Sequence, residues 1–249
     1  MGLVEAQWDM GCQVFCASTS IDASKNAKES NYCLNNERVS DKRTVIANRS
    51  RLQHVIGVSQ IVWMKQVHKN RVSEVTASNK AEITGADIDA CWTKEKGIGL
   101  AVLTADCLPI VVTSQSRDWL GVAHAGWKGL AEDVIGELIG CYRSPSSELV
   151  AWIGPSISKG KYEVGEDVWP MFDKSFSEMT LGVSGGSDKR FLNLIAIAES
   201  QLNDAGVTKL FCSNLCSFSD VRFFSARRLQ QQGTKEYNGR LATVAFLKG

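Results

Sequence analysis

Seven short runs of apolar and β-branched residues set the main constraint on the fold of this 249-residue chain. Each run has the length and residue types of a β-strand. The runs are Ile61–Met64, Ile98–Leu103, Ile110–Thr113, Trp119–Ala123, Leu149–Ile153, Lys209–Cys212 and Leu241–Phe246. Two stretches, Leu130–Tyr142 and Leu192–Ala205, have the three- and four-residue apolar spacing of a helix instead. This order predicts an α/β fold with a mixed β-sheet flanked by helices.

No repeat, low-complexity tract or linker divides the sequence, so we expect residues 1–249 to form a single domain. The polar stretches Ser18–Asn36 and Thr180–Lys189 are expected to be loops. A chain of this length buries roughly three quarters of its unfolded surface, so its stability does not require disulfides.

Charge and hydropathy exclude several classes of protein. The 28 basic and 27 acidic residues nearly balance, which argues against a nucleic-acid or membrane-surface binder. The first residues lack the pattern of a signal peptide, and no apolar stretch approaches the ~18 residues of a membrane span. We therefore expect a cytoplasmic enzyme that acts on a small molecule, as a monomer or a weak homo-oligomer.

Three apolar runs lead into a residue that can bind a metal ion. His68 ends "IVWMKQVH", Cys107 ends "GLAVLTADC" and His124 ends "WLGVAH". Side chains at strand ends leave the packed core but stay on rigid supports, and α/β proteins bind ligands there. Two imidazoles and a thiolate suit zinc, and three protein ligands leave one position for water or substrate.

The same residues allow other interpretations. In a cysteine hydrolase, Cys107 would be the nucleophile and His124 or His68 its base. In a metal-stabilised binding protein, the three side chains would hold a structural ion and no substrate would turn over. Copper is also compatible with two histidines and a cysteine, with Met64 nearby, although a methionine inside an apolar strand is typical of the core.

Six short motifs occur in order along the chain. They are "KQVH" (Lys65–His68), "LTADCLPI" (Leu103–Ile110), "AHAGWKGL" (Ala123–Leu130), "WIGPSI" (Trp152–Ile157), "YEVGEDV" (Tyr162–Val168) and "FFSARR" (Phe223–Arg228). In this order they resemble the YfiH family, also called the laccase-domain or multicopper polyphenol oxidoreductase family. Relatives of that family include purine nucleoside phosphorylases of the FAMIN type.

The resemblance implies that His68, Cys107 and His124 are metal ligands, normally for zinc. It implies a fold grouped with cysteine-hydrolase-like toxins. The implied activity is phosphorolysis of adenosine, inosine and methylthioadenosine, with adenosine deamination in addition. One alternative is a hydrolase, dependent on zinc or on Cys107, that edits cytoplasmic peptidoglycan precursors. Another is a copper-dependent polyphenol oxidase, but a chain with three histidines has too few imidazoles for a multicopper cluster.

Phosphorolysis requires cationic groups for phosphate, and two are expected here. Lys65 lies three positions before His68 and is counted as catalytic together with the three ligands. Arg228 ends the last motif. The alternative for both is a solvated surface charge.

The expected substrate-binding set consists of Gln66, Asp89 and Arg228. Gln66 would hydrogen-bond the sugar or the base. Asp89 and Asp106 are also candidates to orient a ligand imidazole through a carboxylate hydrogen bond. Trp127 could stack on a base, although a tryptophan beside a helix start is more often packed in the core.

Overall fold

The computed structural model describes residues 1–21, 33–35, 42–172, 180–183, 189–233 and 239–249. The strands are β1 (Gly2–Glu5), β2 (Val14–Ser20), β3 (Gln60–Trp63), β4 (Val72–Glu74), β5 (Ala90–Thr93), β6 (Ile98–Thr104), β7 (Leu108–Ser114), β8 (Leu120–Ala125), β9 (Leu149–Ile153), β10 (Glu163–Val164), β11 (Thr180–Val183), β12 (Arg190–Leu192), β13 (Lys209–Cys212) and β14 (Leu241–Leu247). The helices are α2 (Lys42–Ile56), α3 (Lys80–Ile83), α4 (Trp127–Ala131), α5 (Val134–Ile139), α6 (Leu194–Asp204) and α7 (Ala226–Gln231). The seven predicted strands are confirmed as β3, β6, β7, β8, β9, β13 and β14.

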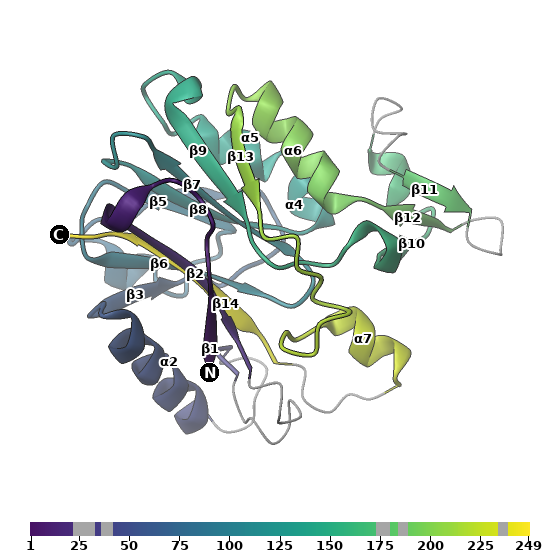
Figure 1. The fold of residues 1–249 in the computed structure, drawn as a ribbon, viewed down its shortest axis with the longest axis horizontal. Helices are drawn as coiled ribbons and strands as arrows, with labels where there is room; N and C mark the ends of the chain where they lie inside the picture. The colour runs from purple at the N-terminus through teal and green to yellow at the C-terminus, as the bar shows by residue number, and fades with distance from the viewer. Residues whose placement is uncertain (22–32, 36–41, 173–179, 184–188, 234–238) are drawn as a thin grey trace.

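Two mixed sheets form the centre of the molecule (Figure 1). The first has the strand order β1-β2-β14-β6-β3 and the second β13-β9-β7-β8-β5-β4, and a small sheet β10-β12-β11 lies to one side. Apolar side chains of both large sheets, such as Val102 and Val122, share one buried cluster, so the sheets pack face to face. Leu52 of α2 packs on the outer face of the first sheet. The predicted α/β class is confirmed, with two large sheets where the sequence predicts one.

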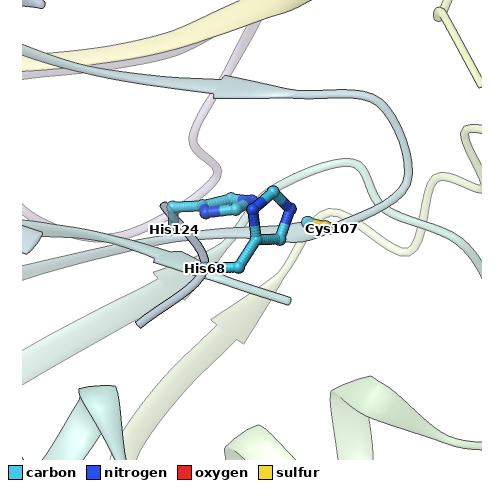
Figure 2. Close-up of side chains that lie close together, drawn as sticks. All are labelled: His68, Cys107 and His124. Carbon is cyan, nitrogen blue, oxygen red and sulfur yellow. The ribbon is translucent and has the colours of Figure 1, made fainter. Parts of the chain in front are cut away.

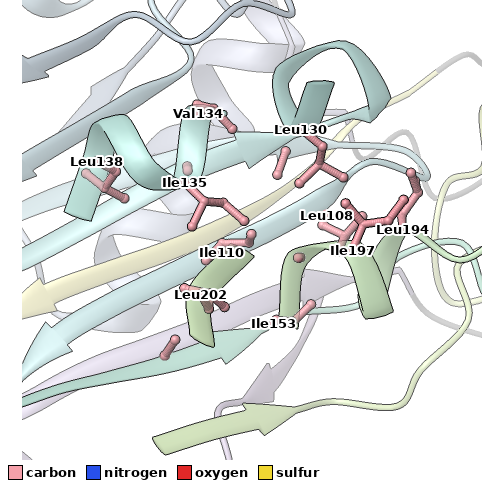
Figure 3. Close-up of a cluster of buried hydrophobic side chains, with 14 of the residues drawn as sticks. Leu108, Ile110, Leu130, Val134, Ile135, Leu138, Ile153, Leu194, Ile197 and Leu202 are labelled. Carbon is pink, nitrogen blue, oxygen red and sulfur yellow. The ribbon is translucent and has the colours of Figure 1, made fainter. Parts of the chain in front are cut away.

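Helices α4, α5 and α6 cover the outer face of the second sheet, where apolar side chains form a large core (Figure 3). The predicted helix over Leu130–Tyr142 is wrong in its continuity. The chain breaks between α4 and α5 at Asp133, which has a left-handed φ of 58° and caps α5 by accepting a hydrogen bond from the Gly136 N–H. Leu130 and Leu138 stay buried on either side of the break. The second predicted helix is confirmed as α6.

Two predicted loops begin with strands. Ser18–Ser20 ends β2, whose neighbour is β14, and the hydroxyl oxygens of Ser18 and Thr243 lie 2.5 Å apart in the core. Thr180–Val183 forms β11. The remaining parts of both predicted loops lie largely outside the described residues. Among the residues that the structure describes, no helix is both long and apolar enough to cross a bilayer.

Candidate functional site

His68, Cys107 and His124 converge from three distant parts of the sequence (Figure 2). One ligand atom from each lies within 4.8 Å of the other two, and the two imidazole rings meet edge to face with their centroids 4.6 Å apart. His124 is buried in β8, Cys107 is half-buried between β6 and β7, and His68 is exposed in the segment after β3. Two nitrogens and a sulfur at this spacing fit a metal cofactor.

A buried carboxylate, Asp89, positions both histidines. Its Oδ1 accepts hydrogen bonds from His124 Nδ1 at 2.8 Å and from the His68 N–H at 2.9 Å. Its Oδ2 accepts from the N–H groups of Val67 at 3.1 Å and Lys69 at 2.8 Å. Because Nδ1 of His124 donates to Asp89, Nε2 is the nitrogen left for a metal. Asp89 therefore has the predicted orienting contact, but its full burial removes it from the expected substrate-binding set.

The cluster is strongly coupled electrostatically. Burial alone would raise the pKa of Cys107, but the charges and hydrogen bonds of His124 and His68 outweigh it and lower that pKa to about 6. Burial alone would lower the pKa of His124, but Cys107 and Asp89 raise it to about 9. At neutral pH the metal-free cluster therefore holds a thiolate beside an imidazolium. The thiolate is the form of cysteine that binds metal ions.

Asp106, next to Cys107, anchors the turn that carries the cysteine. It has a φ of 94°, and its Oδ1 accepts a hydrogen bond from Ser217 Oγ at 2.6 Å. Its Oδ2 accepts from Ser225 Oγ at 3.0 Å and from the Arg227 N–H at 2.7 Å. The prediction that Asp106 orients an imidazole is wrong, because its carboxylate instead ties the Cys107 turn to the segment that leads into α7.

A pocket of about 370 Å³ includes the three cluster residues in its wall. Lys65, the predicted phosphate-binding cation, lines it, with Nζ 2.9 Å from the Asp87 carboxylate. Two arginines that no predicted role covers, Arg49 and Arg240, line it as well. No Asp or Glu occurs among its described lining residues. The pocket therefore suits a ligand that carries negative charge.

Gln66 also lines the pocket, but the backbone engages its side chain. Gln66 Nε2 donates to the Leu103 carbonyl at 2.8 Å, and Oε1 accepts from the Leu103 N–H at 2.7 Å. This pair of bonds joins the segment after β3 to the end of β6. Gln66 therefore helps to hold His68 and Cys107 in register, which is a structural role beside the predicted contact with the sugar or base.

Arg228 and Trp127 are not among the pocket residues. The Arg228 guanidinium donates to the carbonyl oxygens of Ser217, Phe218 and Phe223, all in the segment before α7. These carbonyls engage both terminal nitrogens of its guanidinium outside the pocket, and its role in phosphate binding stays a prediction. Trp127 is half-buried against the core of the second sheet, in agreement with the packing interpretation.

Gly126 provides the space that the Cys107 sulfur needs. A β-carbon at position 126 would lie 2.9 Å from Cys107 Sγ and 3.4 Å from His68 Cδ2. We expect Gly126→Ala to displace the sulfur and to weaken metal binding by about 10- to 100-fold, as changes beside metal ligands do. Competition with a chelator measures this affinity. Gly160→Ala is the control, since a β-carbon there meets nothing within 4 Å. Equal metal affinity in both variants would contradict the contact.

The sequence matches known proteins over most of its length. Residues 20–248 match the sequence profile of a family described as multi-copper polyphenol oxidoreductase laccase. A purine nucleoside phosphorylase of Xylella fastidiosa is 37% identical over 207 residues, which cover 80% of this chain and 77% of that protein. The purine nucleoside phosphorylase YfiH of Escherichia coli is 30% identical over 190 residues, 76% of this chain and 74% of that protein.

Solved structures share the fold. A Neisseria meningitidis protein of family DUF152 superposes with a TM-score of 0.88 at 28% identity, and the match covers 100% of both chains. A Bacillus licheniformis hypothetical protein YfiH gives a TM-score of 0.83 at 24% identity, over 95% of this chain and 93% of that one. Sequence profile, relatives and fold agree, and the chain belongs to the multi-copper polyphenol oxidoreductase laccase family, which is the YfiH family.

Proposed function

We propose that the chain is a zinc-dependent purine nucleoside phosphorylase that acts on adenosine, inosine and methylthioadenosine, with deamination of adenosine as a further activity. The observation that carries the proposal is the convergence of His68, Cys107 and His124 in the wall of a cationic pocket. The names of the Xylella fastidiosa and Escherichia coli relatives support the reaction.

Some residues of the site would hold the metal ion, and others orient its ligands or bind phosphate. His68, Cys107 and His124 would hold the zinc ion, which supplies a Lewis acid or a bound water of lowered pKa. Asp89 accepts the hydrogen bond that His124 donates from Nδ1, so the imidazole orientation is fixed before substrate enters. Lys65 adds positive charge at the pocket for phosphate. A phosphate oxygen then bonds to C1′ of the ribose while the C1′–N9 bond breaks and its electron pair passes to the purine.

Product analysis tests the proposal directly. Zinc-loaded protein is incubated with inosine or adenosine, with and without phosphate, and the products are separated by chromatography. We expect free base and ribose 1-phosphate only when phosphate is present, and inosine from adenosine if deamination also occurs. Cleavage of a muramyl-peptide precursor with no change in any nucleoside would overturn the proposal in favour of the peptidoglycan alternative.

The Cys107 thiolate favours a second candidate, a cysteine hydrolase with Cys107 as nucleophile, and alkylation separates the two. In metal-free protein we expect iodoacetamide labelling of Cys107, measured by peptide mass spectrometry, to rise through pH 6 and level off near neutral pH, because its pKa is about 6. A cysteine of ordinary pKa would gain reactivity up to about pH 9. Zinc is expected to protect Cys107. Turnover that needs no zinc and disappears on alkylation would support the hydrolase instead.

A further inference from the structure

We propose that Arg49 and Arg240 form an oxyanion-binding subsite in the pocket of the His68, Cys107 and His124 cluster. Both arginines line the same cavity as the three cluster residues. The identity of the oxyanion rests on the proposed function: if that function is right, the oxyanion is inorganic phosphate. Recognition of an oxyanion as such rests on the pocket alone.

Arg49 is held at the pocket wall by two contacts that leave its charge unneutralised. It belongs to α2, and its Nε donates to the Leu34 carbonyl at 2.9 Å. Its guanidinium carbon lies 4.1 Å from the ring centre of the buried Trp63, a cation–π contact. Among the described residues, Arg49 has no ion-pair partner. Burial lowers its pKa to about 10, so the side chain remains a cation at neutral pH.

Hydrogen bonds within the fold hold in place the part of the pocket wall that carries both arginines. The Cys33 sulfur is buried and accepts hydrogen bonds from the N–H groups of Asn35 at 3.5 Å and Arg240 at 3.4 Å. Asn48 of α2 donates from Nδ2 to the Cys33 carbonyl at 3.1 Å. Three separate segments are thereby tied together: residues 33–35, helix α2 and the start of β14. Asn35, Arg49 and Arg240 all line the cavity as a result.

The chemistry of the wall selects an oxyanion over other ligands. A guanidinium presents planar, paired N–H donors that match the oxygens of phosphate. No carboxylate lines the described part of the cavity to compete for the donors of Arg49, while Arg240 also donates from Nη1 to the Gly239 carbonyl at 2.8 Å. The third cation of the wall, Lys65, also forms an ion pair with Asp87. An anion beside Arg49 and Arg240 therefore shares one cavity with the metal-binding cluster, which is the placement that a phosphate co-substrate needs.

Phosphate binding tests the subsite without any turnover. Inorganic phosphate is titrated calorimetrically into Arg49→Met, Arg240→Met and wild-type protein at constant ionic strength, in the zinc-loaded form and again after chelation to separate binding to the metal itself. Charge-assisted hydrogen bonds are strong enough that we expect each variant to bind phosphate at least about tenfold more weakly. Arg51→Met is the matched control, since Arg51 is an exposed residue of the same helix and should bind like wild type. Unchanged phosphate affinity in Arg49→Met would overturn the subsite.

A chemical probe covers the case in which a variant fails to fold. Phenylglyoxal modifies accessible arginines, and peptide mass spectrometry reads each site separately in the wild-type protein. Phosphate is expected to slow modification of Arg49 and Arg240 but not of Arg51. Equal rates with and without phosphate at all three positions would contradict the proposal.

Kinetics distinguish this inference from the proposed function. In a working phosphorylase we expect Arg49→Met to raise the KM for phosphate at least about tenfold and to leave the KM for nucleoside within about twofold, with partial rescue by Arg49→Lys. Phosphorolysis with an unchanged phosphate KM would retain the function and reject the subsite. Arg49-dependent phosphate binding in a protein that cleaves no nucleoside would retain the subsite and reject the function.

Discussion

Replacing His68 by asparagine is expected to remove the bound metal and abolish turnover, while the thermal midpoint of unfolding changes little. His68 supplies one of three donor atoms, and its side chain is exposed, so little packing is lost. Its φ of 60° is left-handed, a conformation that asparagine adopts more readily than most residues. Loss of a residue that merely supports a ligand weakens metal binding by about 10- to 100-fold, and loss of a ligand should exceed that.

Metal content by mass spectrometry, nucleoside turnover and a thermal melt together test this expectation. His54→Asn is the matched control, because His54 is an exposed histidine on α2, outside the cluster. We expect that variant to retain both metal and turnover. Full metal occupancy and normal turnover in His68→Asn would remove His68 from the metal site. A large drop in its melting temperature would show that the residue acts through the fold.

The members of the metal-binding cluster could be predicted because each of the three side chains follows an apolar run that is typical of a strand. Cys107 lies directly before β7 and His124 lies within β8, and the sequence shows both strands clearly. Their meeting with His68 could not be read from spacing, since it depends on Asp89, which collects N–H groups from a turn 20 residues earlier in the chain. A single carboxylate that accepts hydrogen bonds from four N–H groups produces no periodic pattern in the sequence.

The cationic wall of the pocket was not predictable for a related physical reason. Arg49 lies in a stretch for which the sequence predicts no helix or strand, and Arg240 precedes an apolar strand. They reach one cavity only because Cys33 joins α2 to the start of β14, accepting hydrogen bonds from the Asn48 side chain at its carbonyl and from the Arg240 N–H at its sulfur. Arg228 is equally suitable by sequence, but it is not among the residues that line the cavity, and nearby carbonyl groups engage its guanidinium. Which arginine serves a ligand is decided by such tertiary contacts.

Asp89→Asn should be the most destabilising of these substitutions. Asparagine replaces one acceptor oxygen with an amino group, so at least one of the four N–H donors around Asp89 loses its partner. Buried donors without partners cost about 1–3 kcal/mol each, and breaking a buried charged pair costs about 3–5 kcal/mol. We expect the free energy of unfolding of the metal-free protein to fall by about 3–5 kcal/mol, measured by urea denaturation. Asp87→Asn, which removes a half-exposed ion pair with Lys65, should lower it by at most about 1 kcal/mol.

The pH dependence of that difference tests whether charge, rather than packing, is responsible. The folded protein lowers the pKa of Asp89, because hydrogen bonds from His124 and from backbone N–H groups outweigh the effect of burial. This stabilisation is present above the unfolded carboxyl pKa of about 4 and is lost as the pH falls below it. The raised pKa of His124 adds stability that is complete below about pH 6.5 and is lost as the pH rises through about 9. The difference between wild type and Asp89→Asn should therefore be largest between about pH 4 and 6.5. A difference that stays constant from pH 3 to pH 10 would show that Asp89 stabilises the site through shape alone, and the imidazole would then need another source for its orientation.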